Sequence, residues 1–148
     1  EGLVVTLARV ITALNGMTFG LTGIAFLVAP TVLAATVDLR LDTPVALNEI
    51  RAFYGGMEVG LGTFLLYVAV RGVWLVPALT LQVLIVGGTI FGRLFGIVLE
   101  GAPGSPVYSL PAIETVMLLA PLVVLARLRS GAGGAAPGSG QSPGAPVG

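Results

Sequence analysis

The stretch RAFYGGMEVGLGTFLLYVAV, from Arg51 to Val70, decides the fold. Its last eight residues are almost entirely apolar, whereas its first twelve carry an arginine, a glutamate seven residues later and four glycines. A helix of roughly 20 apolar residues is long enough to cross the hydrocarbon core of a bilayer, which is about 30 Å thick. We therefore expect a membrane-spanning helix here, whose charges and glycines contact neighbouring helices.

Three more apolar segments of similar length accompany this one. The four predicted helices cover approximately residues 3–29, 47–70, 74–99 and 110–128. None of them alternates polar and apolar residues as the strands of a membrane barrel do. The sequence therefore predicts an all-α integral membrane protein, with a bundle of four transmembrane helices within residues 1–129.

Residues 130–148, SGAGGAAPGSGQSPGAPVG, differ in composition from the rest of the chain. A segment rich in Gly, Ala, Pro and Ser cannot bury enough apolar surface to build a core, so we expect a flexible C-terminal tail. If this tail is held in one place, the simplest cause is the surface of a partner protein. We therefore expect the tail to contact a partner.

The composition excludes most enzymatic chemistry. Only 9% of the residues are charged, and the chain has no His and no Cys, while all of its basic residues are Arg. The usual ligands of zinc, haem and iron–sulfur clusters are therefore missing, and so are Schiff-base lysines and Ser-His or Cys-His pairs. We expect no enzyme, no metal site and no cofactor bound covalently or through His or Cys, although apolar grooves could contact lipid, a quinone or a pigment. The net charge of zero gives no reason to expect nucleic acid as a partner.

The placement of arginine predicts the orientation. With four spans, the N-terminus, the second connection and the C-terminus share one side, which carries Arg9, Arg71, Arg127 and Arg129. The positive-inside rule then places both termini in the cytoplasm. Trp74, beside the second connection, is expected to anchor the helix end at the membrane interface.

Glycines at spacings of four predict close helix packing. Lipid tails are as apolar as the helices, so helices associate in membranes where small residues let their backbones approach. The predicted packing glycines are Gly16 and Gly20, Gly55, Gly56 and Gly60, and Gly88, Gly92 and Gly96. We expect most of them to pack within the bundle, with room for one ridge to face another protein.

The charged residues of the spans form a second pattern. In an α-helix Arg51, Gly55, Glu58 and Gly62 would share one stripe. The topology places a charge cluster in the outer half of the bundle, formed by Glu49, Arg51, Glu58, Arg93, Glu100 and Glu114. Charged groups in a bilayer usually face the protein interior and pair. The cluster is either a structural Arg–Glu network or a site for an ion, a proton or a substrate.

Glu58 differs from the other acidic residues because it lies deeper, where no arginine is expected. We expect it to be protonated, or to be hydrogen-bonded to Tyr54, Asn15 or Gln82.

The segments RAFYGGMEVGLG and FGRLFGIVLEGAP, together with the helical Glu114, resemble the bacterial domain-of-unknown-function 4345 family over about Leu3 to Leu128. The motifs that match are R-x-x-Y-G-G, at Arg51, Tyr54, Gly55 and Gly56, and G-R-x-x-G, at Gly92, Arg93 and Gly96. The resemblance implies a small four-helix integral membrane domain in a bacterial inner membrane. The family has no defined activity, so the resemblance implies no catalytic role for any residue.

Two functions fit these observations. The first is an accessory or structural subunit of a larger membrane complex, such as a photosynthetic or respiratory assembly, with other membrane subunits and lipids as partners. The alternative is a small transporter or channel lined by Arg51, Glu58, Arg93 and Glu114. A membrane enzyme using Glu58 or Glu114 as acid or base is least supported, because no nucleophile or cofactor motif accompanies them. A sealed and fully paired charge cluster would favour the subunit, and a cavity reaching Glu58 would favour transport.

Overall fold

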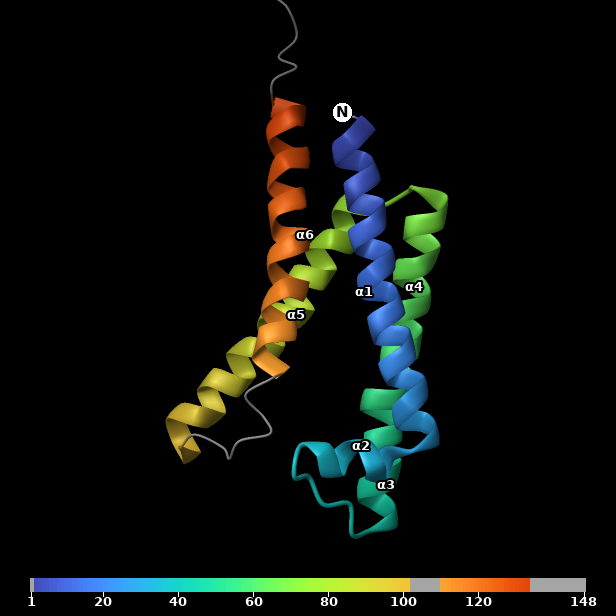
Figure 1. Cartoon of the computed structure of the whole chain (residues 1–148), viewed down its shortest axis with the longest axis vertical. Helices are drawn as coiled ribbons and strands as arrows, with labels where there is room; N and C mark the ends of the chain where they lie inside the picture. The colour runs from blue at the N-terminus through green and yellow to red at the C-terminus, as the bar shows by residue number, and fades with distance from the viewer. Residues whose placement is uncertain (1, 102–109, 134–148) are drawn as a thin grey trace, which may run out of the picture.

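The computed structural model describes residues 2–101 and 110–133, and the described residues are all-α, as predicted. The elements, shown in Figure 1, are α1 (Gly2–Val28), α2 (Pro30–Thr36), α3 (Pro44–Ile50), the π-helix η1 (Arg51–Met57), α4 (Glu58–Arg71), α5 (Leu75–Glu100) and α6 (Leu110–Gly133). Because α3, η1 and α4 follow one another without a break, they form the one long helix predicted around residues 47–70. Helix α6 continues to Gly133, and the rest of the predicted tail lies outside the described residues.

Three helical segments are long and apolar enough to cross a membrane: Gly2–Val28, Pro44–Arg71 and Leu75–Glu100. Large apolar side chains are exposed along these segments, including Leu21, Leu84 and Val98. A contiguous apolar exterior of this extent is costly in water but is the normal surface of a protein whose helices face lipid. The chain is therefore a helical membrane protein.

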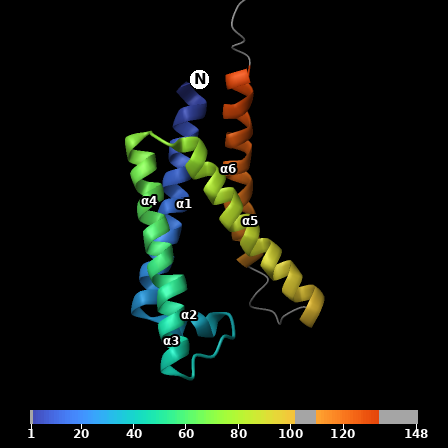
Figure 2. The same cartoon turned by 180° about the vertical axis from the view of Figure 1, so that it is seen from behind.

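The connections bring the start of α1 and the end of α6 to the same end of the molecule. Figure 1 shows the N-terminus, the turn between α4 and α5 and the end of α6 at one end of the molecule, with α2 and α3 at the other. Gly72 ends α4 in the left-handed conformation (φ 69°), which glycine adopts without steric cost. The two buried apolar clusters lie toward this end of the bundle, one around Leu79 and Val124 and the other around Leu65 and Val68. Toward the α2–α3 end, α5 diverges from α4 (Figures 1 and 2).

Helices α1 and α4 are in backbone contact through glycines. A Cβ atom on Gly62 would lie 2.5 Å from the nitrogen of Gly20 and 2.7 Å from the carbonyl oxygen of Gly16. A Cβ atom on Gly23 would lie 2.8 Å from the carbonyl oxygen of Gly55. The contact is formed by two glycines seven residues apart in each segment: Gly16 and Gly23 in α1, and Gly55 and Gly62 in η1 and α4. Residues at this spacing lie on the same side of a helix, so all four face the partner segment. We call this line of glycine contacts the seam.

This contact corrects the predicted spacing of four. A Cβ atom at Gly20 or Gly60 would meet nothing within 4 Å, and one at Gly56 would meet only an atom 3.8 Å away. These positions therefore lie beside the seam rather than on it, although the backbone of Gly20 forms part of the surface that Gly62 meets.

The predicted ridge of α5 is also not a packing surface within the described chain. A Cβ atom at Gly88 or Gly92 would meet nothing within 4 Å, and one at Gly96 would approach only the side chain of Glu100. Helix α5 packs mainly against α6, and it does so through larger residues.

Two arginines satisfy carbonyl groups at the ends of neighbouring helices. Arg9 donates from Nε to the Ala69 oxygen (2.8 Å) and from Nη2 to the Val70 oxygen (2.9 Å), at the C-terminal end of α4. Arg51 donates from Nε to the Leu27 oxygen (3.2 Å) at the end of α1. The last carbonyls of a helix lack intrahelical donors and carry partial negative charge, so a guanidinium stabilises them.

A buried polar network joins α1, α5 and α6. Asn15 Nδ2 donates to Gln82 Oε1 (2.7 Å) and to the Met117 carbonyl oxygen (3.3 Å). The Met117 carbonyl is available because Pro121, four residues later and inside α6, has no N–H to donate to it. Gln82 also donates to Thr12 Oγ1 (3.4 Å). In lipid a freed backbone carbonyl needs such a partner.

We predict that Gly62→Ala destabilises the protein by about 1–3 kcal/mol, the usual cost of forcing extra atoms into a packed contact. The new methyl group would meet backbone atoms of α1, which cannot rotate away. Thermal unfolding in detergent measures the loss. Gly60→Ala is the matched control two residues away, and it should be neutral or slightly stabilising because alanine favours the helix. Equal melting temperatures for the two variants would contradict a close backbone contact at Gly62.

Candidate functional site

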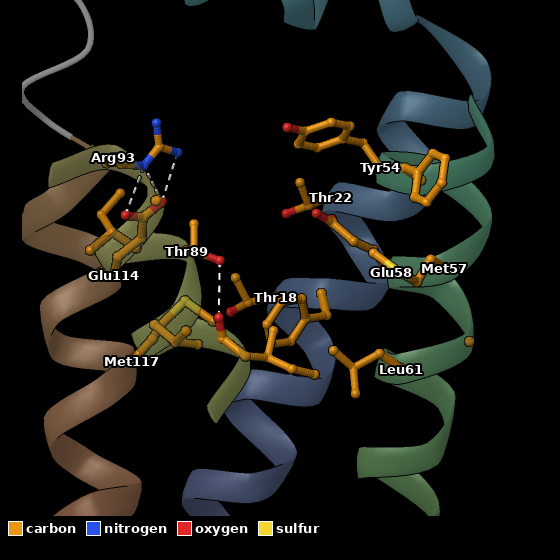
Figure 3. A pocket seen from close by; sticks show the side chains of 17 residues that line it. Thr18, Thr22, Tyr54, Met57, Glu58, Leu61, Thr89, Arg93, Glu114 and Met117 are labelled. Carbon is orange, nitrogen blue, oxygen red and sulfur yellow. Dashed lines mark hydrogen bonds and ion pairs between the residues drawn. The ribbon is translucent and has the colours of Figure 1, made fainter. Parts of the chain in front are cut away.

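A cavity of about 1010 Å³ lies between α1, the η1–α4 segment, α5 and α6. Most of its lining is apolar. The polar groups that reach it are the hydroxyls of Thr18, Thr22, Tyr54 and Thr89 and the charged groups of Glu58, Arg93 and Glu114. Figure 3 shows these side chains converging from both sides of the cavity, with Arg93 and Glu114 opposite Tyr54 and Glu58. The divergence of α5 from α4 leaves this space.

Arg93 and Glu114 form an ion pair between α5 and α6. The Arg93 Nε lies 3.0 Å from both carboxylate oxygens of Glu114, and Nη2 lies 2.8 Å from Oε1. The guanidinium thus binds the carboxylate with two of its nitrogens, which is the strong geometry for this pair. These two members of the predicted charge cluster are therefore in direct contact.

Glu58 lies across the cavity from this pair, as Figure 3 shows. Its Oε2 atom is buried and has no hydrogen-bond partner among the described residues. The alternatives in which Asn15 or Gln82 bonds to Glu58 are wrong, because these two amides bond to each other. An unpartnered buried carboxylate oxygen is costly, so its position beside a cavity is the feature of the site that most needs explanation.

The π-helix η1 shapes the wall that carries Glu58. A π-helix closes its hydrogen bonds over five residues instead of four, which widens the helix and shifts the side chains that follow. Phe53, Tyr54 and Met57 of η1 line the cavity, and Glu58 is the first residue after it. Gly55, in the same segment, still faces α1. The residues predicted to share one face of a regular α-helix therefore face two directions: Gly55 and Gly62 face α1, and Glu58 faces the cavity.

The other residues of the predicted charge cluster do not line the cavity. Arg51, the first residue of η1, donates to the carbonyl oxygen of Leu27 at the end of α1 rather than to a carboxylate. Glu49 and Glu100 are exposed, on α3 and at the end of α5. The cluster is therefore smaller than predicted, and it consists of Glu58 on one wall and the Arg93–Glu114 pair on the other.

Trp74 lies outside the cavity, in the turn before α5. It is 62% exposed, has a positive φ of 57° and places its ring 6.5 Å from the ring of Tyr67. This position at a helix end is the one that an interface anchor would occupy.

Sequence reasoning missed the threonines that line the cavity. Thr18 and Thr89 donate to carbonyls of their own helices, at 3.0 Å each, so their side chains tolerate an apolar setting while their oxygens remain able to accept. Thr18 and Thr22 are four residues apart on α1, a spacing that marks one helix face. No group of three or more possible metal ligands gathers within the described parts of the chain.

We predict that Arg93→Gln and Glu114→Gln each destabilise the protein by about 1–3 kcal/mol, because each leaves the other charge without its partner. The double variant should lose less than the sum of the two single losses, since it leaves no unpaired charge. Thermal unfolding of the three variants in detergent gives the coupling, and Glu100→Gln controls for loss of an exposed carboxylate. Additive losses would show that the pair does not act as a unit.

The comparisons with known proteins place the chain in a family. Neither the curated proteins nor the solved structures include a significant match to it. The family model described as Domain of unknown function (DUF4345) matches residues 7–127, a range that includes every residue lining the cavity. The chain therefore belongs to the DUF4345 family.

Proposed function

We propose that this protein binds a small molecule within the membrane and acts as a small transporter. The observation that carries the proposal is the cavity that reaches the unpartnered Oε2 of Glu58. A purely structural charge network would be sealed and fully paired. Among the residues that the structure describes, only Arg93 and Glu114 form an ion pair, and a space large enough for a ligand separates them from Glu58 (Figure 3).

The dimensions and chemistry of the cavity support this role. Small-molecule sites commonly enclose about 300–1,000 Å³ and combine mainly apolar walls with a few polar groups that orient the ligand. This cavity has a volume of about 1010 Å³ and the same balance of groups. Its polar groups come from all four of its walls, so a small relative movement of the helices would change how a ligand is held.

We further infer the number of spans, the membrane and the orientation of the protein. Helix α6 is the fourth span, because it runs beside α1 and α5 and buries Val124 and Leu125 against them. The bundle lies in a bacterial inner membrane. Both termini face the cytoplasm, because the end of the molecule at which α1 begins and α6 ends also carries Arg9, Arg71, Arg127 and Arg129.

We predict that Gly92→Leu abolishes ligand binding and transport by filling the cavity. Gly92 lines the cavity, and a side chain there would meet no protein atom within the first 4 Å. Gly88→Leu is the matched control, on the same helix one turn earlier, with equally open surroundings but outside the cavity lining. Uptake assays with proteoliposomes and a panel of small amphipathic compounds measure the effect. Equal activity of both variants would contradict a role for the cavity.

An accessory subunit of a larger membrane complex, such as a photosynthetic or respiratory assembly, is the second candidate. Gly88 and Gly96 favour it, because little or nothing packs on them within the described chain and helices can approach closely there. We predict in this case that gentle extraction from native membranes gives stoichiometric co-migration with a larger complex on a native gel. The Gly88→Leu variant should then no longer co-migrate with the complex. Migration of the wild-type protein as a free or self-associated bundle would exclude this role.

A further inference from the structure

We propose that the ligand of the cavity is a hydrophobic organic cation, such as an amine or onium compound with aromatic or aliphatic substituents, whose charge binds at Glu58. This inference rests on the proposed small-molecule function and names the class of molecule that the site selects. It follows from the charge balance of the cavity, from its aromatic residues and from its apolar walls.

The charge balance of the lining leaves one carboxylate uncompensated. Within the described parts of the chain, the charged groups that line the cavity are two carboxylates, Glu58 and Glu114, and one guanidinium, Arg93. Arg93 is committed to Glu114 through both Nε and Nη2, at 2.8–3.0 Å. The remaining carboxylate, with its buried Oε2 unpartnered, is therefore free to bind a positive charge.

The other arginines of the nearby helices are held elsewhere. Arg51, seven residues before Glu58, donates to the Leu27 carbonyl and does not line the cavity. Arg9 donates to carbonyls at the far end of α4. A cation in the cavity would thus meet a carboxylate without a competitor, whereas an anion would have to compete with Glu114 for Arg93.

Aromatic rings stand beside the same carboxylate. Phe19, Phe53 and Tyr54 line the cavity, and Figure 3 shows the Tyr54 hydroxyl pointing into it above Glu58. The faces of aromatic rings attract organic cations, and the attraction is greatest where water is excluded. An anion would be repelled by the same ring faces.

The walls beyond Glu58 favour an apolar body on that cation. Leu61, Ile85, Val86 and Ile113 line the cavity, whose volume far exceeds the space a metal ion needs. A small hydrated ion would leave these walls in contact with water, whereas a hydrophobic cation would cover them and gain from burial. The site therefore selects by charge at one wall and by apolar bulk elsewhere.

Three probes of similar shape separate charge from hydrophobicity: tetraphenylphosphonium, tetraphenylborate and the neutral triphenylphosphine oxide. Binding to the full chain in lipid nanodiscs is measured by equilibrium dialysis, with empty nanodiscs subtracted to remove partition into lipid. We expect saturable binding of one tetraphenylphosphonium per chain, weaker binding of the neutral probe and no binding of tetraphenylborate above the blank.

Variants then assign the charge preference to Glu58. Glu58→Gln should weaken tetraphenylphosphonium binding by about tenfold to a hundredfold, as expected when one partner of a charged contact is lost. Its binding of the neutral probe should stay unchanged, which also shows that the variant is folded. Glu58→Asp should keep the preference for the cation, and Glu100→Gln, which removes an exposed carboxylate outside the cavity, should bind like the wild type.

The outcomes distinguish the ligand class from the proposed function. If tetraphenylborate or the neutral probe binds as tightly as the cation, or if Glu58→Gln leaves cation binding unchanged, the cation assignment is wrong. When Gly92→Leu still blocks those probes, the cavity remains a binding site for another class of ligand. If no probe binds saturably to the wild type, the small-molecule function fails together with the cation assignment.

Discussion

The backbone contact between α1 and the η1–α4 segment determines how the other helices are arranged. Gly16, Gly23, Gly55 and Gly62 allow the two helices to approach until a single added methyl group would meet main-chain atoms. In lipid, where apolar burial drives little association, such contact supplies much of the packing energy. Because α1 and α4 are fixed to each other, α5 packs mainly against α6 instead and diverges from α4. The cavity is the consequence of this division into two pairs.

Polar groups in this bundle are satisfied locally, and Glu58 is the exception. Arg9 and Arg51 bind helix ends, Asn15 binds Gln82 and the carbonyl freed by a proline, and Arg93 binds Glu114. Each arrangement removes the cost of a polar group in an apolar medium. The carboxylate oxygen of Glu58 has no such partner in the described chain. Since its burial beside open space costs stability, a ligand that supplies the missing partner gives this residue a physical reason to be there.

The helices could be predicted from the sequence, and so could the location of Arg93 and Glu114 in the same half of the bundle, whereas the packing seam and the cavity could not. Apolar length decided the spans, and alternating helix direction brought Arg93 near Glu114. Of the predicted packing glycines, Gly16 and Gly55 lie on the seam, whereas Gly56 and Gly60 do not. Many small residues lie in these helices, and only tertiary contact selects those on the seam. No residue pattern in RAFYGGM indicates a π-helix, so the direction of the Glu58 side chain relative to Gly55 could not be predicted. No prediction used Pro121, which leaves the Met117 carbonyl without an intrahelical donor, and the partner of that carbonyl, Asn15, comes from another helix.

An experimental structure of the protein in lipid nanodiscs, determined with bound tetraphenylarsonium, would show whether the cavity binds an organic cation at Glu58. The heavy arsenic atom marks the position of the positive charge. The account predicts one arsenic site inside the cavity, on the side of Glu58 and facing the Tyr54 ring, with the Arg93–Glu114 pair intact. A cavity closed by movement of α5 against α4, with the Glu58 carboxylate bonded to another protein group and no arsenic site beside it, would contradict the account.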